Sequence, residues 1–288
     1  MHRCPVSVVV LTKNEARLLE RCLRSVAWAD EHVVVDCGST DGTQALAAQL
    51  GARVVEQSWL GWVPQRQCGA EAARHDWVFF IEADEIVDAE LAAAVQAAIA
   101  SGPNPQDGYA VDRRDEFFGQ LFPNMKNRAR RRAFIRLFNR RHSRYTATNI
   151  IHEEVEIKGR SIALPGVLLH WRSFTLAEQM GRYIGNADLE ATQMAQAGAR
   201  AGILKLLAWP MLRFAWCYLA RGGWRLGEAG LVHAMMAAHS EFLRWATLWE
   251  RQKVEHRADP PAHFLAGSRA VGGPTAAPGA ADRTAHQT

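Results

Sequence analysis

The stretch Trp77-Val78-Phe79-Phe80-Ile81-Glu82-Ala83-Asp84-Glu85 decides the fold, because an apolar run here ends in a cluster of carboxylates. A short apolar run bounded by charge predicts a strand buried on both faces. Glu82 and Asp84 are two residues apart at its end, a spacing that lets both carboxylates converge on one hard cation. A nucleotide diphosphate needs such a cation, Mg²⁺ or Mn²⁺. The alternative interpretation is a strand that leads into a solvated, acidic helix start.

Strands and helices alternate on both sides of this stretch over the first 100 residues. The strands are expected at residues 7–12, 32–36, 53–56 and 77–82, and the helices at 15–28, 43–50 and 65–74. This alternation predicts an α/β fold with a parallel sheet whose two faces are covered by helices. In such sheets a ligand binds beyond the carboxyl ends of the strands.

Polar and acidic residues collect at those carboxyl ends. They are Thr12, Asn14 and Glu15 after the first strand, Asp36, Gly38, Ser39 and Asp41 after the second, and Glu82, Asp84 and Glu85 after the fourth. Residues 12–15 contain no glycine, so neither a dinucleotide-binding glycine motif nor a P-loop is present. A nucleotide is therefore expected to be held by side chains and a metal ion. For residues 36–42 the alternative is a tight turn with a helix cap.

Composition sets the broad class. With 288 residues, 48% of them hydrophobic, the chain allows one large domain or two modest ones. The five cysteines are odd in number and scattered, which suits a reducing cytosol and argues against a zinc site. The apolar run at residues 6–11 is too short for a signal peptide. A cytosolic protein is expected.

Positive charge is concentrated in the middle of the chain. The residues that carry it are Lys126, Arg128, Arg130, Arg131, Arg132, Arg136, Arg140, Arg141 and Arg144. Strands are expected at residues 108–113 and 133–138, on either side of a loop at 117–132 that mixes aromatic and basic side chains. Nucleic acid, anionic lipid headgroups and a phosphorylated saccharide all match this charge. A solvated basic loop is the alternative.

Three motifs resemble those of inverting family 2 glycosyltransferases of the GT-A fold: Ser-Val-Val-Val-Leu-Thr-Lys-Asn-Glu at 7–15, Val-Val-Val-Asp-Cys-Gly-Ser-Thr-Asp-Gly-Thr at 33–43 and Ile-Glu-Ala-Asp-Glu at 81–85. Residues 27–31, 136–138 and 151–153 add a narrower resemblance to the lipopolysaccharide-core β-1,4-glucosyltransferases. The resemblance implies a Rossmann-like nucleotide-sugar domain with a mainly parallel central sheet, followed by a helical C-terminal region.

The resemblance also implies roles for individual residues. Thr12, Asn14 and Glu15 would border the nucleoside, Asp36 would contact the base, and Gly38, Ser39 and Asp41 would line the same pocket. Asp84 would hold the divalent ion. Apart from the resemblance, Arg66 or the basic loop is a candidate to add positive charge to the diphosphate. The family usually has Asp-x-Asp where this chain has Glu82-Ala83-Asp84, so the role of Glu82 as a second metal ligand is left open.

Inverting transfer needs a base that takes the proton from the acceptor hydroxyl. Three ionisable residues, His152, Glu153 and Glu154, follow one another in the chain. The resemblance favours Glu153, and Glu154 is the alternative, because alternation along a strand turns only one of the two towards the pocket. His152 is expected to orient the base or contact phosphate, with a purely structural role as its alternative.

The last third of the chain predicts helices at residues 176–197, 202–219 and 231–249. The second is strongly apolar, but Lys205, Pro210 and Arg213 interrupt it. A transmembrane span is therefore not expected, and a helix lying in the headgroup region of a membrane fits better. The alternative is a helix packed on the catalytic domain or on a second subunit. Residues 257–288 are rich in Ala, Gly and Pro, which predicts a disordered tail.

The sequence therefore predicts a catalytic domain at 1–172, with a nucleotide-sugar half at 1–100 and an acceptor half at 101–172, then a helical region at 173–256. The predicted enzyme uses Mg²⁺ or Mn²⁺ to transfer a hexose, glucose from UDP-glucose, with inversion onto a lipopolysaccharide-core or other envelope glycan or glycolipid. It is expected to lie on the inner face of the cytoplasmic membrane, in contact with anionic lipid, and its oligomeric state is left open.

Two alternatives are kept beside this prediction. A nucleotidyltransferase would bring a glycine-rich, basic loop after the first strand, and none is present. A nucleic-acid-binding protein would use the basic segment 126–144, but most of the aromatic residues lie outside that segment, so no nucleic acid partner is expected.

Overall fold

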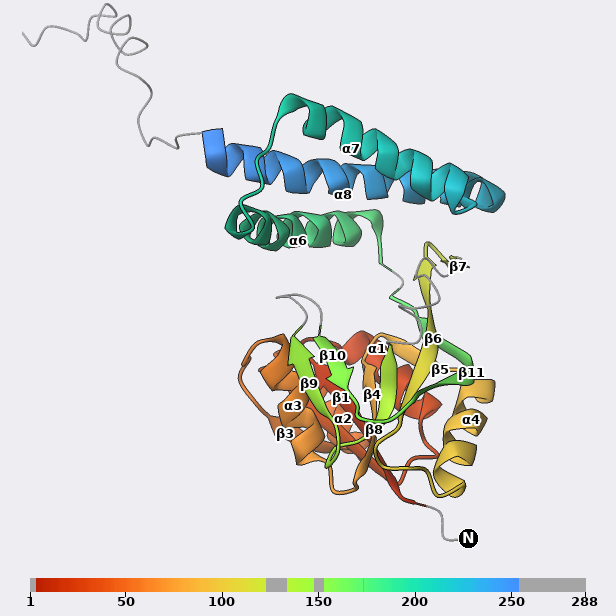
Figure 1. Ribbon diagram of the computed structural model, residues 1–288. Coiled ribbons are helices and arrows are strands. Elements are labelled where there is room, and N and C mark those ends of the chain that lie inside the picture. Colours follow the sequence, from red (N-terminus) through yellow and green to blue (C-terminus); the bar gives the residue numbers. More distant parts are fainter. Residues whose placement is uncertain (1–3, 123–133, 148–152, 173, 254–288) are drawn as a thin grey trace, which may run out of the picture.

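A computed structural model describes residues 4–122, 134–147, 153–172 and 174–253 of the chain. A sheet flanked by helices forms one part of the molecule, and three long helices are stacked above one edge of that sheet (Figure 1).

Four parallel strands form the first part of the sheet, as the sequence predicts. They are β1 (Val6–Thr12), β2 (Glu31–Asp36), β3 (Arg53–Glu56) and β4 (Trp77–Glu82), in the order β3-β2-β1-β4. The register pairs Thr12 with Asp36 and Leu11 with Glu82. The three strand ends that carry polar residues therefore meet at one edge of the sheet.

Helices cover both faces of these strands. They are α1 (Ala16–Ser25), α2 (Thr43–Gln49) and α3 (Trp62–Ala72). On α1 the apolar positions predicted from helical spacing are buried in the core. The helix α3 packs closely on the opposite face, because a Cβ atom at Gly69 would lie 2.9 Å from Val9. It starts three residues earlier than predicted, since Pro64 in a first helical turn loses no hydrogen bond.

The sheet continues beyond β4 in the order β4-β8-β6-β11-β5. The elements that follow β4 in the chain are β5 (Glu85–Val87), α4 (Ala89–Ala100), β6 (Gly108–Phe117), β7 (Gln120–Leu121), β8 (Ile135–Asn139) and β11 (Ser161–His170). The strand β8 runs antiparallel to both β4 and β6, whereas β6 and β11 are parallel. Antiparallel pairing of β11 with β5 places His170 opposite Glu85. Two further strands, β9 (Arg144–Ala147) and β10 (Glu153–Glu156), form a separate hairpin.

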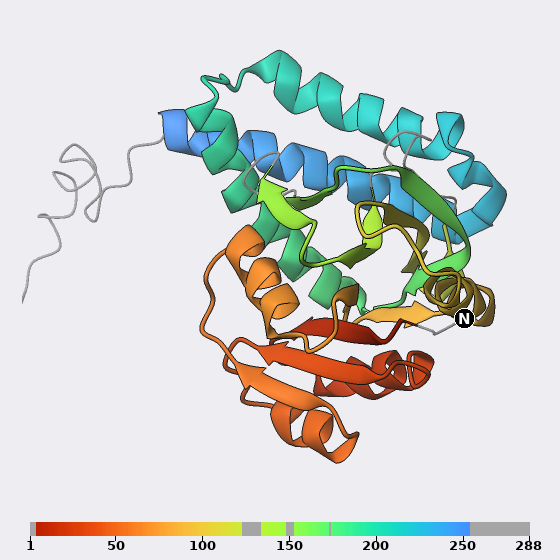
Figure 2. The same ribbon diagram turned by 60° about the horizontal axis from the view of Figure 1, so that its bottom comes forward.

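The helical region is built along its longest helix. Its elements are α6 (Leu176–Gln196), α7 (Ile203–Ala215), a π-helical turn η1 (Trp216–Ala220), a 3-10 turn η2 (Gly223–Leu226) and α8 (Gly227–Lys253). The helix α6 begins with a capping box between Thr175 and Glu178. Figures 1 and 2 show α8 packed against both α6 and α7, with α6 nearer to the sheet.

One helix in the described part of the chain, Ile203–Ala220, is long and apolar enough to cross a membrane by length and composition alone. Only 6% of it is buried. One side of this helix packs lengthwise on α8, and the rest is exposed.

Candidate active site

Asp36 organises the loop that follows β2. Its buried carboxylate accepts five hydrogen bonds: Oδ1 from the N–H groups of Gly38 (3.0 Å) and Ser39 (2.8 Å) and from Gln44 (2.7 Å), and Oδ2 from the hydroxyls of Thr12 (2.9 Å) and Ser39 (2.5 Å). Burial raises the pKa of Asp36, but these hydrogen bonds outweigh it and hold the pKa below its usual value. The acceptor positions of the Asp36 carboxylate are thus used by donors of the protein itself. The predicted hydrogen bond from a nucleotide base to Asp36 stays a prediction, and it would require one of these donors to move away.

The loops after β1 and β2 are joined by hydrogen bonds. The backbone N–H of Asn14 donates to the hydroxyl of Ser39 (2.7 Å), and the Asn14 side chain accepts from the N–H of Thr40 (2.8 Å). Asn14 adopts a φ of 58°, which asparagine tolerates better than most residues. Asp41 accepts from the N–H of Ala16 (3.1 Å), and the turn contains Gly38 with a φ of 86°. The structure therefore brings together the residues predicted for the nucleoside pocket.

Glu15 lies where this loop meets α1. Its backbone N–H donates to Thr43 (2.9 Å). Burial, and then the charge of Asp84, raise the pKa of Glu15 to about 7, against the opposing effect of Arg182 and Arg172. Glu15 is thus electrostatically linked to the carboxylates at the end of β4.

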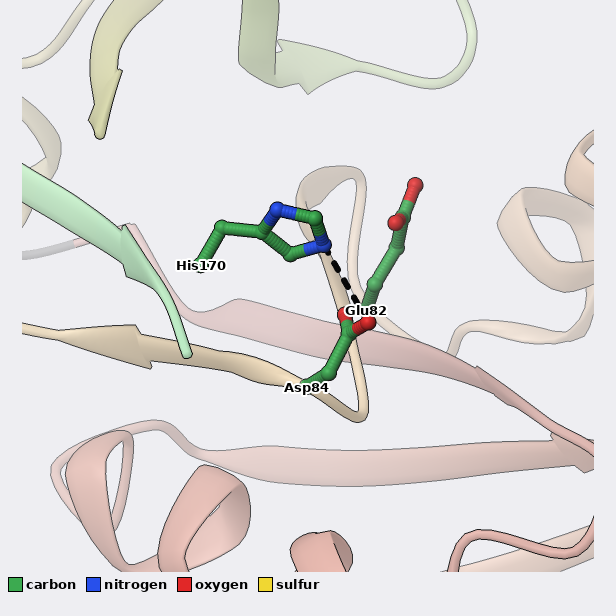
Figure 3. A group of neighbouring side chains, drawn as sticks. All are labelled: Glu82, Asp84 and His170. Atoms are coloured by element: carbon green, nitrogen blue, oxygen red, sulfur yellow. Dashed lines mark hydrogen bonds and ion pairs between the residues drawn. The ribbon is translucent and has the colours of Figure 1, made fainter. Parts of the chain in front are cut away.

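Three side chains, those of Glu82, Asp84 and His170, each offer a ligand atom within 4.8 Å of the others. Figure 3 shows the imidazole of His170 facing Asp84, with Glu82 beside them. Oδ2 of Asp84 accepts hydrogen bonds from Nε2 of His170 (3.1 Å) and from Nε of Arg172 (2.7 Å). Oδ1 of Asp84 is buried and has no hydrogen-bond partner in the described structure. A buried, unpartnered carboxylate oxygen is costly, and a cation would satisfy it. The residues present therefore fit a divalent ion of the Mg²⁺ or Mn²⁺ class.

Asp115 holds the imidazole of His170 from the other side. The distance between Nδ1 of His170 and Oδ1 of Asp115 is 2.6 Å. Burial lowers the pKa of His170, but the hydrogen bonds to Asp115 and Asp84 outweigh it, so the pKa is raised. A metal-binding histidine commonly has a carboxylate on its other ring nitrogen. Asp115 takes that place at Nδ1, so Nε2 of His170 faces the candidate metal position.

Glu82 shares its charge with arginines. Arg66 on α3 donates to Oε1 of Glu82 (2.6 Å), and Arg136 on β8 lies 3.6 Å from the same atom. Burial raises the pKa of Glu82, yet Arg66 and Arg136 hold it well below its usual value. Glu82 is therefore a weaker candidate ligand than Asp84. The contact of Arg66 with a diphosphate stays a prediction, since Arg66 donates to Glu82 in this structure.

Glu85 anchors the turn that carries these ligands. It is fully buried, and it accepts hydrogen bonds from the N–H of Glu82 (2.8 Å) and from Arg136 (2.9 Å). Arg113 lies 3.6 Å from it, and the ring of Phe134 lies 4.3 Å from the guanidinium of Arg136. These contacts join the turn from Glu82 to Glu85 to the strands β6 and β8, which carry Arg113 and Arg136.

The candidate bases lie on or beside the β9–β10 hairpin. Glu154 is exposed, and Glu156, two residues along the strand, pairs with Arg144 (2.8 Å). The backbone of Glu153 pairs with Ala147, while its side chain and the whole of His152 lie outside the described residues. The choice between Glu153 and Glu154 stays a prediction.

Only part of the basic segment is described. Lys126, Arg128 and Arg130–Arg132 lie outside the described residues. Among the others, Arg136 pairs with Glu85, Arg141 with Asp76 (2.5 Å) and Arg144 with Glu156. The described arginines of this segment therefore serve intramolecular ion pairs, and they give no support to a nucleic-acid surface.

Three residues of the site were not predicted from the sequence: His170, Arg172 and Asp115. The available signal was the apolar run Val167-Leu168-Leu169, which is strand-like and ends at a histidine. The carboxyl end of β11, where His170 lies, is at the same edge of the sheet as the carboxyl end of β4.

Comparison with known proteins gives a consistent result. The family model described as glycosyl transferase family 2 matches residues 7–159. The lipopolysaccharide core biosynthesis glycosyltransferase LpsC of Rhizobium meliloti (strain 1021) is 31% identical over 88% of this chain and 96% of its own length. An uncharacterized glycosyltransferase of Rickettsia bellii is 27% identical over 85% of this chain and 86% of its own. Among solved structures, the mannosyltransferase PcManGT of Pyrobaculum calidifontis, in complex with GDP-Man and Mn²⁺, is similar with a TM-score of 0.44 and 21% identity, covering 94% of this chain and 81% of that one.

Proposed function

This chain belongs to glycosyl transferase family 2 and has the GT-A fold, and from that premise we propose that it transfers a hexose with inversion, using a divalent ion. The proposed donor is UDP-glucose, and the proposed acceptor is a lipopolysaccharide-core or other envelope glycan or glycolipid. The observation that carries this proposal is the buried, unpartnered Oδ1 of Asp84 beside His170 and Glu82. The motif resemblance supports the donor, and the relative named for lipopolysaccharide core biosynthesis supports the acceptor class.

Each part of the site has a task in this reaction. Asp84 and His170 hold the ion, and Glu82 adds negative charge beside them. When bound, such an ion neutralises the charge that develops on the leaving diphosphate. The joined loops at Asn14 and Ser39 border the nucleoside. Glu153 accepts the proton of the acceptor hydroxyl as the sugar carbon is attacked.

Calorimetric titration of the purified chain with UDP, GDP and UDP-glucose, with and without Mn²⁺, tests this proposal. We expect UDP and UDP-glucose to bind in a Mn²⁺-dependent manner. Asp84→Asn is expected to weaken that binding by about 100-fold, because it removes a charged ligand. Asp76→Asn is the matched control, since Asp76 lies before β4, at the opposite end of the strand, and pairs with Arg141. Equal, metal-independent binding in the wild type and Asp84→Asn would sink the assignment.

Peripheral contact with an anionic membrane is a further part of the proposed function. The side of α7 that faces away from α8 exposes large apolar residues, among them Ile203, Leu204 and Met211, each more than 70% exposed. Arginines accompany the tryptophans at the end of this surface: Arg213 and Arg221 lie over Trp216, at 5.2 and 4.8 Å. Apolar side chains with flanking Trp and Arg suit the headgroup boundary of an anionic bilayer.

A further inference from the structure

Four arginines from three different segments gather next to the metal cluster. Arg17 and Arg21 lie on α1, Arg172 follows β11, and Arg182 lies on α6. Three of them surround one aromatic ring: the guanidinium carbons of Arg17, Arg172 and Arg182 lie 6.0, 5.5 and 4.9 Å from the centre of Phe174. Arg172 also donates to Asp84 (2.7 Å), so this arginine cluster directly adjoins the metal ligands.

The cluster is poorly neutralised by the protein. Within the described structure, Nε and Nη2 of Arg21 are buried without a hydrogen-bond partner, and Arg182 forms no ion pair. Arg17 lies 3.8 Å from Oε1 of Glu178, and the other oxygen of that carboxylate is engaged by Thr175 in the cap of α6. Burial lowers the pKa values of Arg21 and Arg182, and it outweighs the opposing effect of Asp84.

The contrast with a neighbour on the same helix is informative. Arg17 and Arg21 are four residues apart and so share a face of α1, where like charges destabilise a helix. Arg24, on the next turn, pairs with Glu20 at 2.7 Å. On this helix Arg24 is neutralised by Glu20, whereas two nitrogens of the partly buried Arg21 have no hydrogen-bond partner in the described structure. Buried donors without a partner are costly unless a ligand supplies the acceptor.

We propose that Arg17, Arg21, Arg172 and Arg182 form a subsite for an anionic group on the acceptor, a phosphate or a carboxylate on the sugar that receives the hexose. This inference rests on the proposed function and names its acceptor class. Guanidinium groups bind phosphate and carboxylate in a bidentate manner, which suits recognition of such a group. The donor diphosphate would be bound separately, by the divalent ion that Asp84 and His170 are proposed to hold.

Titration with glucose 6-phosphate, and with glucose as the neutral comparison, tests the subsite. The chain is titrated both alone and saturated with Mn²⁺ and UDP, and binding is followed by calorimetry. We expect glucose 6-phosphate to bind in both states and glucose to bind in neither. Arg21→Gln and Arg182→Gln should each weaken glucose 6-phosphate binding by about 10-fold, the effect of losing one charge-assisted hydrogen bond. Arg24→Gln should have no effect.

The affinity for UDP with Mn²⁺ is measured in the same variants. It is expected to stay within two-fold of the wild-type value, a difference of about 0.4 kcal/mol in binding free energy. A large loss of UDP affinity in Arg21→Gln and Arg182→Gln would overturn the proposal, because the arginines would then serve the donor. Binding of glucose 6-phosphate that is absent, or equal in all variants, would also overturn it. If the wild type does not bind UDP but does bind glucose 6-phosphate, and Arg21→Gln weakens that second binding, the result would count against the proposed function alone.

Discussion

Asp115 supports the candidate metal site through its 2.6 Å hydrogen bond to Nδ1 of His170, and it also pairs with Arg113 at 3.2 Å. Removing its charge should let the imidazole rotate and should lower its basicity. We expect Asp115→Asn to weaken Mn²⁺ binding by about 10- to 100-fold, the usual effect of losing such a partner. Mn²⁺ binding can be followed by electron paramagnetic resonance of the free ion. Asp112→Asn on the same strand is the control, because Asp112 lies beside Arg114 (3.5 Å) and not beside His170. Unchanged affinity in Asp115→Asn would show that His170 is not a ligand.

Glu15 predicts a pH-dependent effect on stability. Its pKa is raised to about 7 in the folded protein, from an ordinary value of 4.5, with burial as the main cause. Between these two values the folded state binds a proton that the unfolded state has lost, so stability falls as the pH rises through this range. Glu15→Gln should therefore stabilise the protein at pH 8 by about 1 to 2 kcal/mol, a discounted value because solvent reaches the group, and should have no effect at pH 4.

Urea unfolding of the wild type and Glu15→Gln at both pH values measures this difference. Glu20→Gln on the exposed side of the same helix is the control, since its partner Arg24 is also exposed. A Glu15→Gln variant that is less stable than the wild type at pH 8 would contradict the raised pKa.

The sequence predicts those site residues that lie at the end of a recognisable strand. Thr12, Asp36 and Asp84 each follow a β-branched or aromatic run, and the parallel register then brings them together. His170 is different, because it reaches Asp84 across 86 residues of chain, through the pairing of β11 with β5. No local pattern specifies that pairing, so sequence reasoning did not place His170 in the site.

At the scale of elements, the position of β11 depends on a glycine. Gly166 has a φ of 87° and lies at a bulge in β11, where an added Cβ would be 2.1 Å from the backbone nitrogen of Leu91. Asp88 secures the same contact: it caps α4 through the N–H of Leu91 (2.7 Å) and accepts from the N–H of Val167 (3.0 Å). The bulge therefore positions the last residues of β11, including His170.

We expect Gly166→Ala to lower the free energy of unfolding by more than about 3 kcal/mol, because conformational strain and a backbone clash act together. Gly102→Ala is the matched control: Gly102 also has a positive φ, 68°, but no atom lies within 4 Å of its added Cβ. That variant should lose only about 1 kcal/mol. Thermal unfolding measures both variants, and equal losses would show that the contact with α4 is not tight.

Helical periodicity predicts the helices well, whereas sheet order is less accessible from sequence. The buried positions of α1 follow from spacing alone. The insertion of β8 between β4 and β6, antiparallel to both, has no signal in the sequence, because strand order is decided by packing of the whole sheet. The predicted helix at 202–219 is similarly divided, since its last turn is π-helical and leads into the turn before α8.

Across the whole molecule, the helical region contacts the catalytic part through the end of β6. The rings of Phe117 and Phe122 lie 4.8 and 4.3 Å from the ring of His233 on α8. Burial, and then Arg213, lower the pKa of His233 to about 4, so the contact is between neutral rings at physiological pH. The helix α6 also brings Arg182 towards the site. The boundary between a catalytic domain at 1–172 and a helical region at 173–256 stays a prediction. Residues on both sides of it, Arg172 and Arg182, lie beside the same site.

The exposed surface of α7 gives a prediction for the intact protein. The double variant Leu204→Glu with Met211→Glu should reduce binding to vesicles of phosphatidylcholine and phosphatidylglycerol by about 100-fold, because it removes two exposed apolar side chains that would enter the bilayer and adds negative charge. Leu189→Glu is the control, since Leu189 is also exposed but lies on α6, on the other side of α8 (Figure 1).

Co-sedimentation with vesicles measures the binding, and analytical ultracentrifugation without lipid measures the oligomeric state. Because arginines flank the apolar surface, wild-type binding should weaken in vesicles of phosphatidylcholine alone and at high salt. A wild-type dimer that the double variant converts to monomer, with no vesicle binding by either, would identify the surface as a subunit interface. The acceptor would then have to reach the site from solution, because the enzyme would not bind the bilayer.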